Sequence, residues 1–398
     1  VESGNFVIGA PFLPGDTVAA PLLNGQNVTV KALAGDIIIN PGASIDTFGA
    51  GIATAIGNNV LLNGGSISGV LNATATAGNF AMSGGSVAGV LNAFVTSGNV
   101  TQTGGNITAL INANANSGNV SLSQAGSYTL GRVSATGSAS VNSTGGAITD
   151  GNAGVNVVAP SAVLVGAAGV GTLAAPIETQ VATLSGRATG SFGVINSGDL
   201  AINGFTFGGG DAAIGSTGIL SLMTPIGTSS GNLFLTANNG MVINRNVTVS
   251  GNLNLNSGAG DLGIAGASVS ANNISLNGNN IFVGFTTSTA PTTVSASNLL
   301  TASSTGNLNV LGGANVLRIN LDAVSKRAPG WPYKILLVAS LLITLVVGAI
   351  DGASRDGGFL NSGTNSKWIY DTIYSPMSAA LFALLAFFIA SAAFRAFR

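Results

Sequence analysis

Residues 60–119 divide into three rows of twenty that align along their whole length: VLLNGGSISGVLNATATAGN (60–79), FAMSGGSVAGVLNAFVTSGN (80–99) and VTQTGGNITALINANANSGN (100–119). A glycine pair recurs at the fifth and sixth positions of each row, and Gly-Asn closes each row. A fourth row begins at Val120 with VSLSQAGS and then diverges. Self-similarity at a fixed period of this length indicates a stacked repeat architecture.

Each row has the pattern of short β-strands joined by tight turns. Leu71, Ala73 and Ala75 alternate with polar residues, and the matching positions of the next two rows repeat this alternation. A period of two gives a strand one buried face. The glycine-containing pairs suit turns that need positive φ. Since no row contains an apolar stripe of helical length, we expect an all-β fold.

A unit of twenty residues is too short to bury its own apolar face, so it must stack on its neighbours. The sequence therefore predicts a parallel β-helix, or β-solenoid, over residues 1–320, with one row per coil. About sixteen coils would form a rod roughly 75 Å long, because parallel strands lie about 4.8 Å apart. Two inward columns are expected from the spacing: Val60, Phe80, Val100 and Val120 in one, and Leu71, Leu91 and Ile111 in the other.

Asn72, Asn92 and Asn112 form a further column at the same spacing. In a structural interpretation, the stacked amides hydrogen-bond along the rod axis. In a functional interpretation, they form a polar face that contacts a carbohydrate or a host protein. We favour the ladder because the column is short.

Later stretches keep this pattern of short strands and glycine-containing turns, with less regular spacing. Examples are GNVSLSQAGS from Gly118, GGAITDGN from Gly145 and GVGTLAAPIETQVATLSG from Gly169. On these motifs, residues 25–316 resemble the filamentous haemagglutinin-like large exoproteins of bacteria. The resemblance implies a right-handed parallel β-helix that is secreted and used for adhesion. It is specific for architecture and says little about the ligand.

Composition excludes several kinds of chemistry. The chain contains no histidine and no cysteine, which rules out a disulfide scaffold, a Cys/His zinc site and catalysis by Ser-His-Asp or Cys-His groups. The net charge is −1, so nucleic acid is not an expected partner. We expect no cofactor and no bound metal.

Some parallel β-helices are carbohydrate-active enzymes, which need clustered carboxylates. In this sequence the acids are scattered, and Asp150, Glu178, Asp199, Asp211 and Asp261 do not recur at the twenty-residue spacing. Asp199 and Asp211 could approach each other across coils, but isolated aspartates more often serve in turns. We expect a protein that is not an enzyme, and a carbohydrate-active β-helix enzyme is the second alternative.

The chain changes character near Leu321, beyond which both tryptophans and most of the basic residues lie. We predict a juxtamembrane linker at 321–334 and a two-helix transmembrane hairpin at 335–398, with helices at about 332–350 and 377–396. Each helix contains an uncharged apolar run that approaches the length a bilayer requires. Aromatic residues precede both runs, as is typical of a membrane interface.

Small residues share one face of each predicted helix. They are Ser340, Thr344 and Gly348 in the first helix, and Ala383, Ala386 and Ala390 in the second. Lipid is as apolar as leucine, so close packing has to hold such helices together. We expect the two small-residue faces to pack against each other.

The first functional hypothesis is an adhesin-type solenoid of the bacterial cell envelope, anchored in the lipid bilayer, with the solenoid outside the cytoplasm. Its partner would be a host or matrix glycan or protein, and homo-oligomers or lateral assembly would be compatible with it. In the first alternative, the hairpin is a subunit or anchor of a membrane complex and the solenoid is a spacer. Five basic residues flank the two apolar runs and two lie between them, which by the positive-inside rule favours cytoplasmic chain ends and opposes the first hypothesis.

Overall fold

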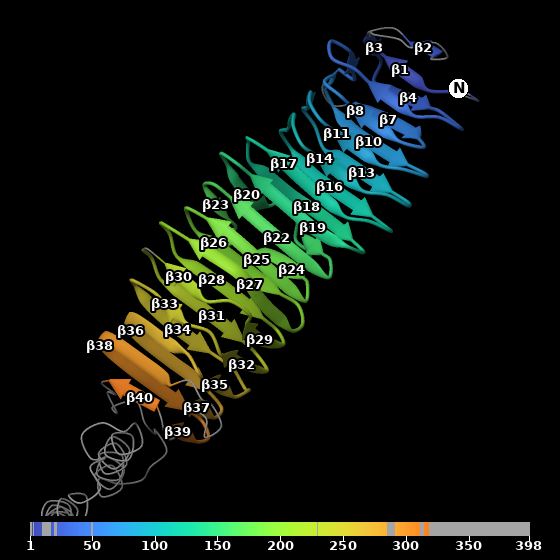
Figure 1. The fold of residues 1–398 in the computed structure, drawn as a ribbon. Coiled ribbons are helices and arrows are strands. Elements are labelled where there is room, and N and C mark those ends of the chain that lie inside the picture. Colours follow the sequence, from blue (N-terminus) through green and yellow to red (C-terminus); the bar gives the residue numbers. More distant parts are fainter. Residues whose placement is uncertain are drawn as a thin grey trace, which may run out of the picture.

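The computed structural model describes residue 2 and residues 4–9, 17–19, 22–48, 51–228, 230–284, 291–310 and 314–317. Within these ranges every regular element is a β-strand, and neighbouring strands pair in parallel. The strands stack into an elongated β-solenoid of about 13 turns, which runs from the blue to the orange end of the ribbon (Figure 1). The predicted all-β parallel solenoid is therefore confirmed.

The first face of the rod is a column of strands in which each strand pairs with the next. It consists of β1 (Phe6–Ile8), β5 (Ile37–Ile39), β8 (Val60–Leu62), β11 (Phe80–Met82), β14 (Val100–Gln102), β17 (Val120–Gln124), β19 (Ser138–Ser143), β22 (Ser161–Gly166), β25 (Thr183–Ala188), β27 (Leu200–Phe207), β29 (Ile219–Leu222), β32 (Gly240–Ile243), β35 (Leu262–Ile264), β37 (Ile281–Val283) and β39 (Leu308–Val310).

The second face is a parallel column that carries the longer strands. It consists of β4 (Asn27–Lys31), β7 (Ile52–Gly57), β10 (Val70–Ala75), β13 (Leu91–Val95), β16 (Leu110–Ala115), β18 (Tyr128–Ala135), β20 (Ala147–Asp150), β21 (Val157–Val158), β23 (Gly169–Val170), β24 (Ile177–Gln180), β26 (Phe192–Asn196), β28 (Ala212–Ser216), β31 (Leu233–Ala237), β34 (Asn252–Asn256), β36 (Ser268–Gly278) and β38 (Thr292–Ser304). In its middle, one turn contributes β20 and β21 and the next contributes β23 and β24, with a loop between the two strands of each pair.

A third row of short strands lies between these faces in chain order. Near the N-terminal end it is a five-stranded sheet of β3 (Leu22–Asn24), β6 (Ser44–Asp46), β9 (Ser66–Ile67), β12 (Ser86–Val87) and β15 (Asn106–Ile107). In the C-terminal half, the short strands are β30 (Ile226–Thr228), β33 (Val247–Thr248) and β40 (Ala314–Leu317), which pair with parts of β27, β36 and β38. The remaining strand, β2 (Thr17–Ala19), pairs with β1.

The columns expected from the twenty-residue spacing lie inside the rod. Val60, Phe80, Val100 and Val120 stand in register in consecutive strands of the first face, and none is more than 1% exposed. Leu71, Leu91 and Ile111 stand in register on the second face, and all are 0% exposed. Burial of these apolar side chains between turns is the main favourable term for stacking.

Over the described ranges the rod has about 13 turns, whereas about sixteen are predicted for residues 1–320. The step between turns is twenty residues from Val60 to Val120, but it reaches 27 residues between Asn280 and Asn307. The extra residues enter where turns lengthen, and the strands keep their pairing. From Ile37 in β5 to Leu308 in β39 the first face advances 308 − 37 = 271 residues in thirteen steps, about 21 residues a step, so the period holds on average. The predicted number was too high because it assigned every residue of 1–320 to a coil of twenty.

The Gly-Asn pair at each row end builds a second ladder. The Asn79 side-chain oxygen accepts the backbone N–H of Asn99 at 2.8 Å, and Asn99 in turn accepts the N–H of Asn119 at 2.8 Å. A Cβ atom on Gly98 would lie 2.3 Å from the Gly78 carbonyl oxygen of the preceding turn. Glycine is therefore required here by close approach between turns, whereas positive φ explains the second glycine of the pair at Gly85 and Gly105.

A buried glutamine closes the end of the five-stranded sheet. β15 is its last strand, and the Gln124 side-chain oxygen accepts the Ile107 N–H at 2.9 Å while its nitrogen donates to the Ile107 carbonyl at 3.3 Å. The amide thus takes the place of a further strand at an edge that would otherwise be unpaired. Gln102 donates to Gln124 and accepts from the Tyr128 hydroxyl, whose pKa is raised by burial.

Two asparagines do the same where the second face is interrupted. Asn196 accepts the N–H of Val181 at 2.9 Å and donates to the carbonyl of the same residue at 3.1 Å. Asn156 accepts the N–H of Glu178 at 2.9 Å and donates to the carbonyl of Leu130 at 3.1 Å. Both asparagines are 0% exposed, so their amides act as internal backbone substitutes.

The predicted hairpin, with its packing residues Ser340, Thr344, Gly348, Ala383, Ala386 and Ala390, lies outside the described residues, as does the linker. Within the described ranges, no helical segment has the length and apolarity needed to cross a bilayer.

Leu91→Asp tests the interior column. Loss of a buried leucine side chain costs about 2–5 kcal/mol, and the buried carboxyl group adds a desolvation cost. We expect a large loss of thermal stability measured by circular dichroism. Val163→Asp, at an outward position of β22 that is 39% exposed, is the matched control and should change stability little. Equal losses in both variants would contradict the inward register.

Gln124→Leu tests the amide that closes the third row. It keeps the approximate side-chain volume and leaves two backbone groups of Ile107 unpaired, at about 1–3 kcal/mol each. We expect a lower melting temperature and faster hydrogen exchange at the Ile107 amide. Asn142→Leu, which removes one 3.5 Å contact on the outward side of β19, should leave both unchanged. An unchanged Ile107 exchange rate in Gln124→Leu would show that the amide does not close the edge.

Candidate binding clefts on the second face

Most of the described aspartates are tied to the backbone of the next turn. Asp36 accepts the N–H of Asn59 at 3.1 Å and its side-chain amide at 2.8 Å. Asp211 accepts both groups of Asn232 in the same way, at 3.0 and 2.9 Å. Asp261 does the same with Asn280. These carboxylates close turns, at positions equivalent to those that asparagines fill in the regular rows.

The sequence left open an approach of Asp199 and Asp211. The structure places them at different corners of one turn of the coil, Asp199 before β27 on the first face and Asp211 before β28 on the second face, and Asp199 accepts the N–H of Ile219 at 2.8 Å. Asp150 accepts the N–H of Asn152 at 2.9 Å. In the described part of the chain, no three acidic side chains come close enough to hold a metal ion.

Glu178 differs from the aspartates. One oxygen of its carboxylate is buried and has no hydrogen-bond partner among the described residues. The residue lies on β24, beside the loop of residues 171–176, and its backbone N–H is held by Asn156. A single such carboxylate provides neither an acid–base pair nor a metal site.

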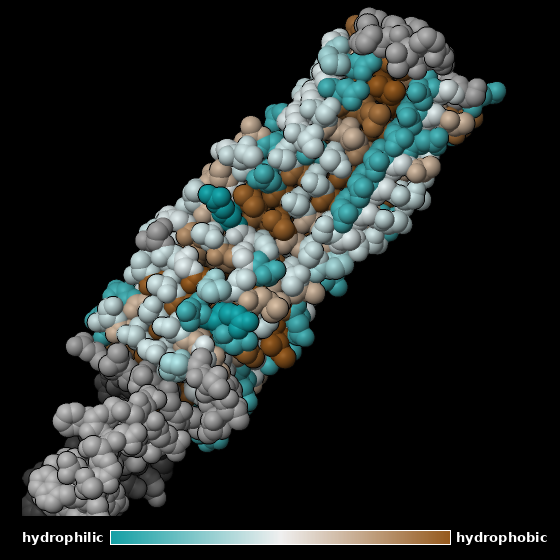
Figure 2. Space-filling model, viewed as in Figure 1, coloured by the Kyte–Doolittle hydropathy of each residue, from teal (hydrophilic) through white to brown (hydrophobic). Residues whose placement is uncertain are grey.

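The predicted asparagine column is a hydrogen-bonded ladder on the outside of the second face. Asn92 donates its side-chain amide to Asn72 at 2.8 Å, and Asn112 donates to Asn92 at 2.8 Å. Asparagine-rich columns of this kind give the N-terminal half of the rod a hydrophilic stripe beside apolar patches (Figure 2). The ladder ends at Asn112, whose oxygen accepts the backbone N–H of Arg132 at 2.8 Å.

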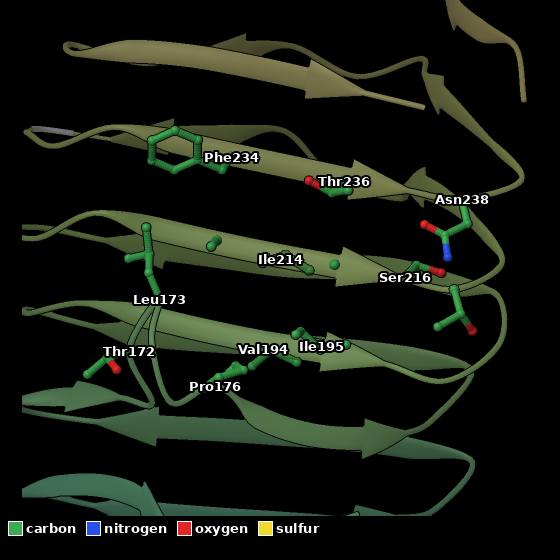
Figure 3. A pocket seen from close by; sticks show the side chains of 13 residues that line it. Thr172, Leu173, Pro176, Val194, Ile195, Ile214, Ser216, Phe234, Thr236 and Asn238 are labelled. Carbon is green, nitrogen blue, oxygen red and sulfur yellow. The ribbon is translucent and has the colours of Figure 1, made fainter. Parts of the chain in front are cut away.

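The first of two clefts, which we name the Phe234 cleft, has a volume of about 320 Å³. It lies on the second face across β26, β28 and β31 and is overhung by the loop of residues 171–176. Figure 3 shows Phe234 and Thr236 on β31, above Ile214 on β28, with Leu173 reaching from the loop toward β28.

Small residues create this cleft. A Cβ atom on Gly193 would lie 2.1 Å from the Thr172 carbonyl oxygen, so the loop can rest on β26 only because residue 193 is glycine. On β28, a Cβ atom on Gly215 would meet nothing closer than 3.6 Å, which leaves a hollow row between Ile195 and Phe234. Leu173 and Ile195 are 49% and 46% exposed, so the cleft is walled by apolar groups that face solvent.

The second cleft, which we name the Phe94 cleft, also has a volume of about 320 Å³ and lies across β13, β16 and β18. Its lining combines one aromatic ring, one guanidinium group, amides and a hydroxyl: Asn92, Phe94, Asn112, Asn114, Arg132 and Ser134, together with two alanines. Phe94 is 39% exposed. This combination gives flat apolar contact, hydrogen bonding and a positive charge in one place.

A β-bulge positions Arg132 in this cleft. The register between β16 and β18 shifts between Ile111 and Ala113, so that Gly131 and Arg132 together oppose Asn112. A Cβ atom on Gly131 would lie 2.1 Å from the Asn112 side-chain oxygen, so glycine is required there. Bulges of this type re-aim a side chain and are frequent beside functional sites.

Neither cleft was predicted from the sequence, although two signals for the Phe94 cleft are visible there. Phe94 occupies a position that holds Thr74 in the row before and Asn114 in the row after. Arg132 is a rare cation in a solenoid sequence with few charges. What the sequence does not reveal is that a bulge brings the arginine to the end of the asparagine ladder, one strand beyond the row of Asn114.

Comparisons of this chain with protein-family models, with curated proteins and with solved structures found no match.

Proposed function

We propose that this chain is a non-enzymatic, adhesin-type β-solenoid of the bacterial cell envelope, which binds its partner through its lateral surface. The observation that carries the proposal is that the polar groups at the turns serve the structure, whereas the second face leaves exposed clefts. Aspartates and turn asparagines hold the backbone of the next turn, while the second face presents open clefts with exposed Phe94, Leu173 and Ile195. Exposed apolar patches rimmed by polar residues mark interaction sites.

The stacked architecture suits this role. Each turn contacts only its neighbours, so a rod can extend a binding surface far from its point of attachment without a large globular core. Parallel strands that connect by short turns favour a right-handed coil, as in other parallel crossovers. The resemblance of residues 25–316 to filamentous haemagglutinin-like exoproteins supports the same role.

The alternative of a carbohydrate-active enzyme is less well supported. Glycoside hydrolysis needs two carboxyl groups on opposite sides of one scissile bond. Asp211 is hydrogen-bonded to Asn232, and Asp199 to the backbone of Ile219, at different corners of the coil. These two carboxylates are engaged in holding the next turn and do not face each other across one substrate site.

The proposed membrane attachment rests on the sequence of residues 335–398 alone. Two apolar runs with preceding aromatic residues favour a helical hairpin that tethers the rod to the lipid bilayer. The bias of basic residues toward the chain ends favours the alternative, in which the solenoid is a spacer in a membrane complex.

Purified full-length protein should bind saturably to host-cell or extracellular-matrix surfaces and should not release products from glycans. Binding is expected because the clefts are exposed without any ordering step. The measurement pairs a surface-binding assay with chromatography of incubated polysaccharides, and heat-unfolded protein is the control. Turnover that Asp211→Asn or Asp199→Asn abolishes would overturn the proposal, as would absence of saturable binding to any of these surfaces.

Disulfide crosslinking tests the hairpin, because the chain has no cysteine of its own. In membranes, Thr344→Cys with Ala386→Cys should crosslink within one chain, since small residues allow close helix approach. Leu345→Cys with Leu385→Cys is the matched pair on the other faces and should not crosslink. Crosslinks only between chains would assign the small faces to oligomerisation, and the reverse pattern would show that the predicted packing is wrong.

A further inference from the structure

We infer that the Phe94 cleft binds a carboxylate-bearing sugar of an acidic glycan, with the Arg132 guanidinium contacting the carboxylate. This inference deepens the proposed function and rests on it, because it names the class of partner and the side chains that select it. It is carried by the charge, the geometry and the chemistry of the cleft lining.

Arg132 provides an unpaired positive charge. Its guanidinium makes no hydrogen bond or ion pair to any other residue that the structure describes, and it is the single charged side chain in the lining of the cleft. A guanidinium group matches a carboxylate with two parallel N–H donors. An anion in the cleft would therefore meet a cation that has no competing partner among the described residues.

The backbone at Arg132 is fixed by a hydrogen bond and by the β-bulge. The Arg132 N–H donates to Asn112 at 2.8 Å, and the bulge at Gly131 directs the side chain out of the second face. Asn112 is itself fixed through Asn92 and Asn72. The asparagine ladder thus fixes the backbone from which the Arg132 side chain projects.

The remaining lining favours a sugar ring over a bare anion. Phe94 presents an apolar ring against which the C–H face of a pyranose can pack. The side chains of Asn114 and Ser134 make no hydrogen bond to another described residue, so they are available to vicinal hydroxyl groups. Small-ligand sites usually combine an apolar surface with a few polar groups, as this cleft does. Its volume lies at the lower end of the roughly 300–1,000 Å³ that is typical of ligand cavities.

The charge around the cleft argues for a single carboxylate rather than a long polyanion. The described residues include four basic side chains and eight acidic ones, so the rod as a whole does not attract a chain of phosphates. The Phe234 cleft contains no charged lining residue, so it does not offer the same selection.

The test is a glycan array in which each acidic glycan, uronic or sialic, stands beside its carboxyl-reduced neutral form. The full-length protein should bind acidic members in preference to their neutral forms, with an affinity that falls as salt is added. Arg132→Gln should weaken this binding by about 10–100-fold, the range for hydrogen bonds to a charged group. Arg132→Lys keeps the positive charge but lacks the planar guanidinium with its parallel N–H donors. Its affinity should therefore lie between those of the unchanged protein and Arg132→Gln.

Arg187→Gln is the matched control, because Arg187 is an exposed strand arginine on β25 that lines neither cleft. It should bind like the unchanged protein, and all variants should keep the same circular dichroism melting curve. Equal binding of acidic and neutral members, or unchanged binding by Arg132→Gln, would overturn the inference while the proposed function stands. Binding to no glycan on the array would also overturn it, whereas the proposed function fails only if the protein also binds no cell or matrix surface.

Discussion

Parallel hydrogen bonding between successive turns is the constraint on which this molecule depends. Every backbone group on the flank of one turn needs a partner in the next, so each turn has to repeat the path of its neighbour closely. Regular rows meet this requirement with apolar columns such as Phe80 on Val100 and with turn asparagines that hold the following N–H. Close packing at Gly98 shows how little room the repeat leaves for any other residue.

Departures from regularity have two consequences, one inside and one outside. Inside, a lost strand partner is replaced by a side-chain amide, as Gln124 does for Ile107 and Asn196 does for Val181. Outside, the same departures make the otherwise flat surface of the sheet uneven. A loop overhangs the Phe234 cleft, and a bulge places Arg132 in the Phe94 cleft. Both clefts therefore arise where the repeat is broken, while the repeat itself supplies a regular support.

The fold could be predicted from sequence because its determinants are local and periodic. Three aligned rows suffice to place Leu91 inside and Asn92 outside, since one register satisfies all of them. The number of turns could be extrapolated only approximately, because the step between turns on the first face varies from 18 residues (Thr183 to Ala201) to 27 residues (Ile281 to Leu308). The clefts could not be predicted either, because they depend on how the loop of residues 171–176 lies across Gly193 and on which residue bulges opposite Asn112. Phe94 and Arg132 stand out in the sequence, but only the register of the turns shows that they line the same hollow.

The distance between two outward positions on the first face tests this account most directly. Leu61 and Val163 are connected by consecutive register partners through β11, β14, β17 and β19, which makes five steps between turns. Spin labels at Leu61→Cys and Val163→Cys, in a chain without native cysteine, should give one narrow distance near 24 Å by pulsed electron paramagnetic resonance, at about 4.8 Å per step. A broad distribution, or a distance far from this value, would show that the turns do not stack in one register.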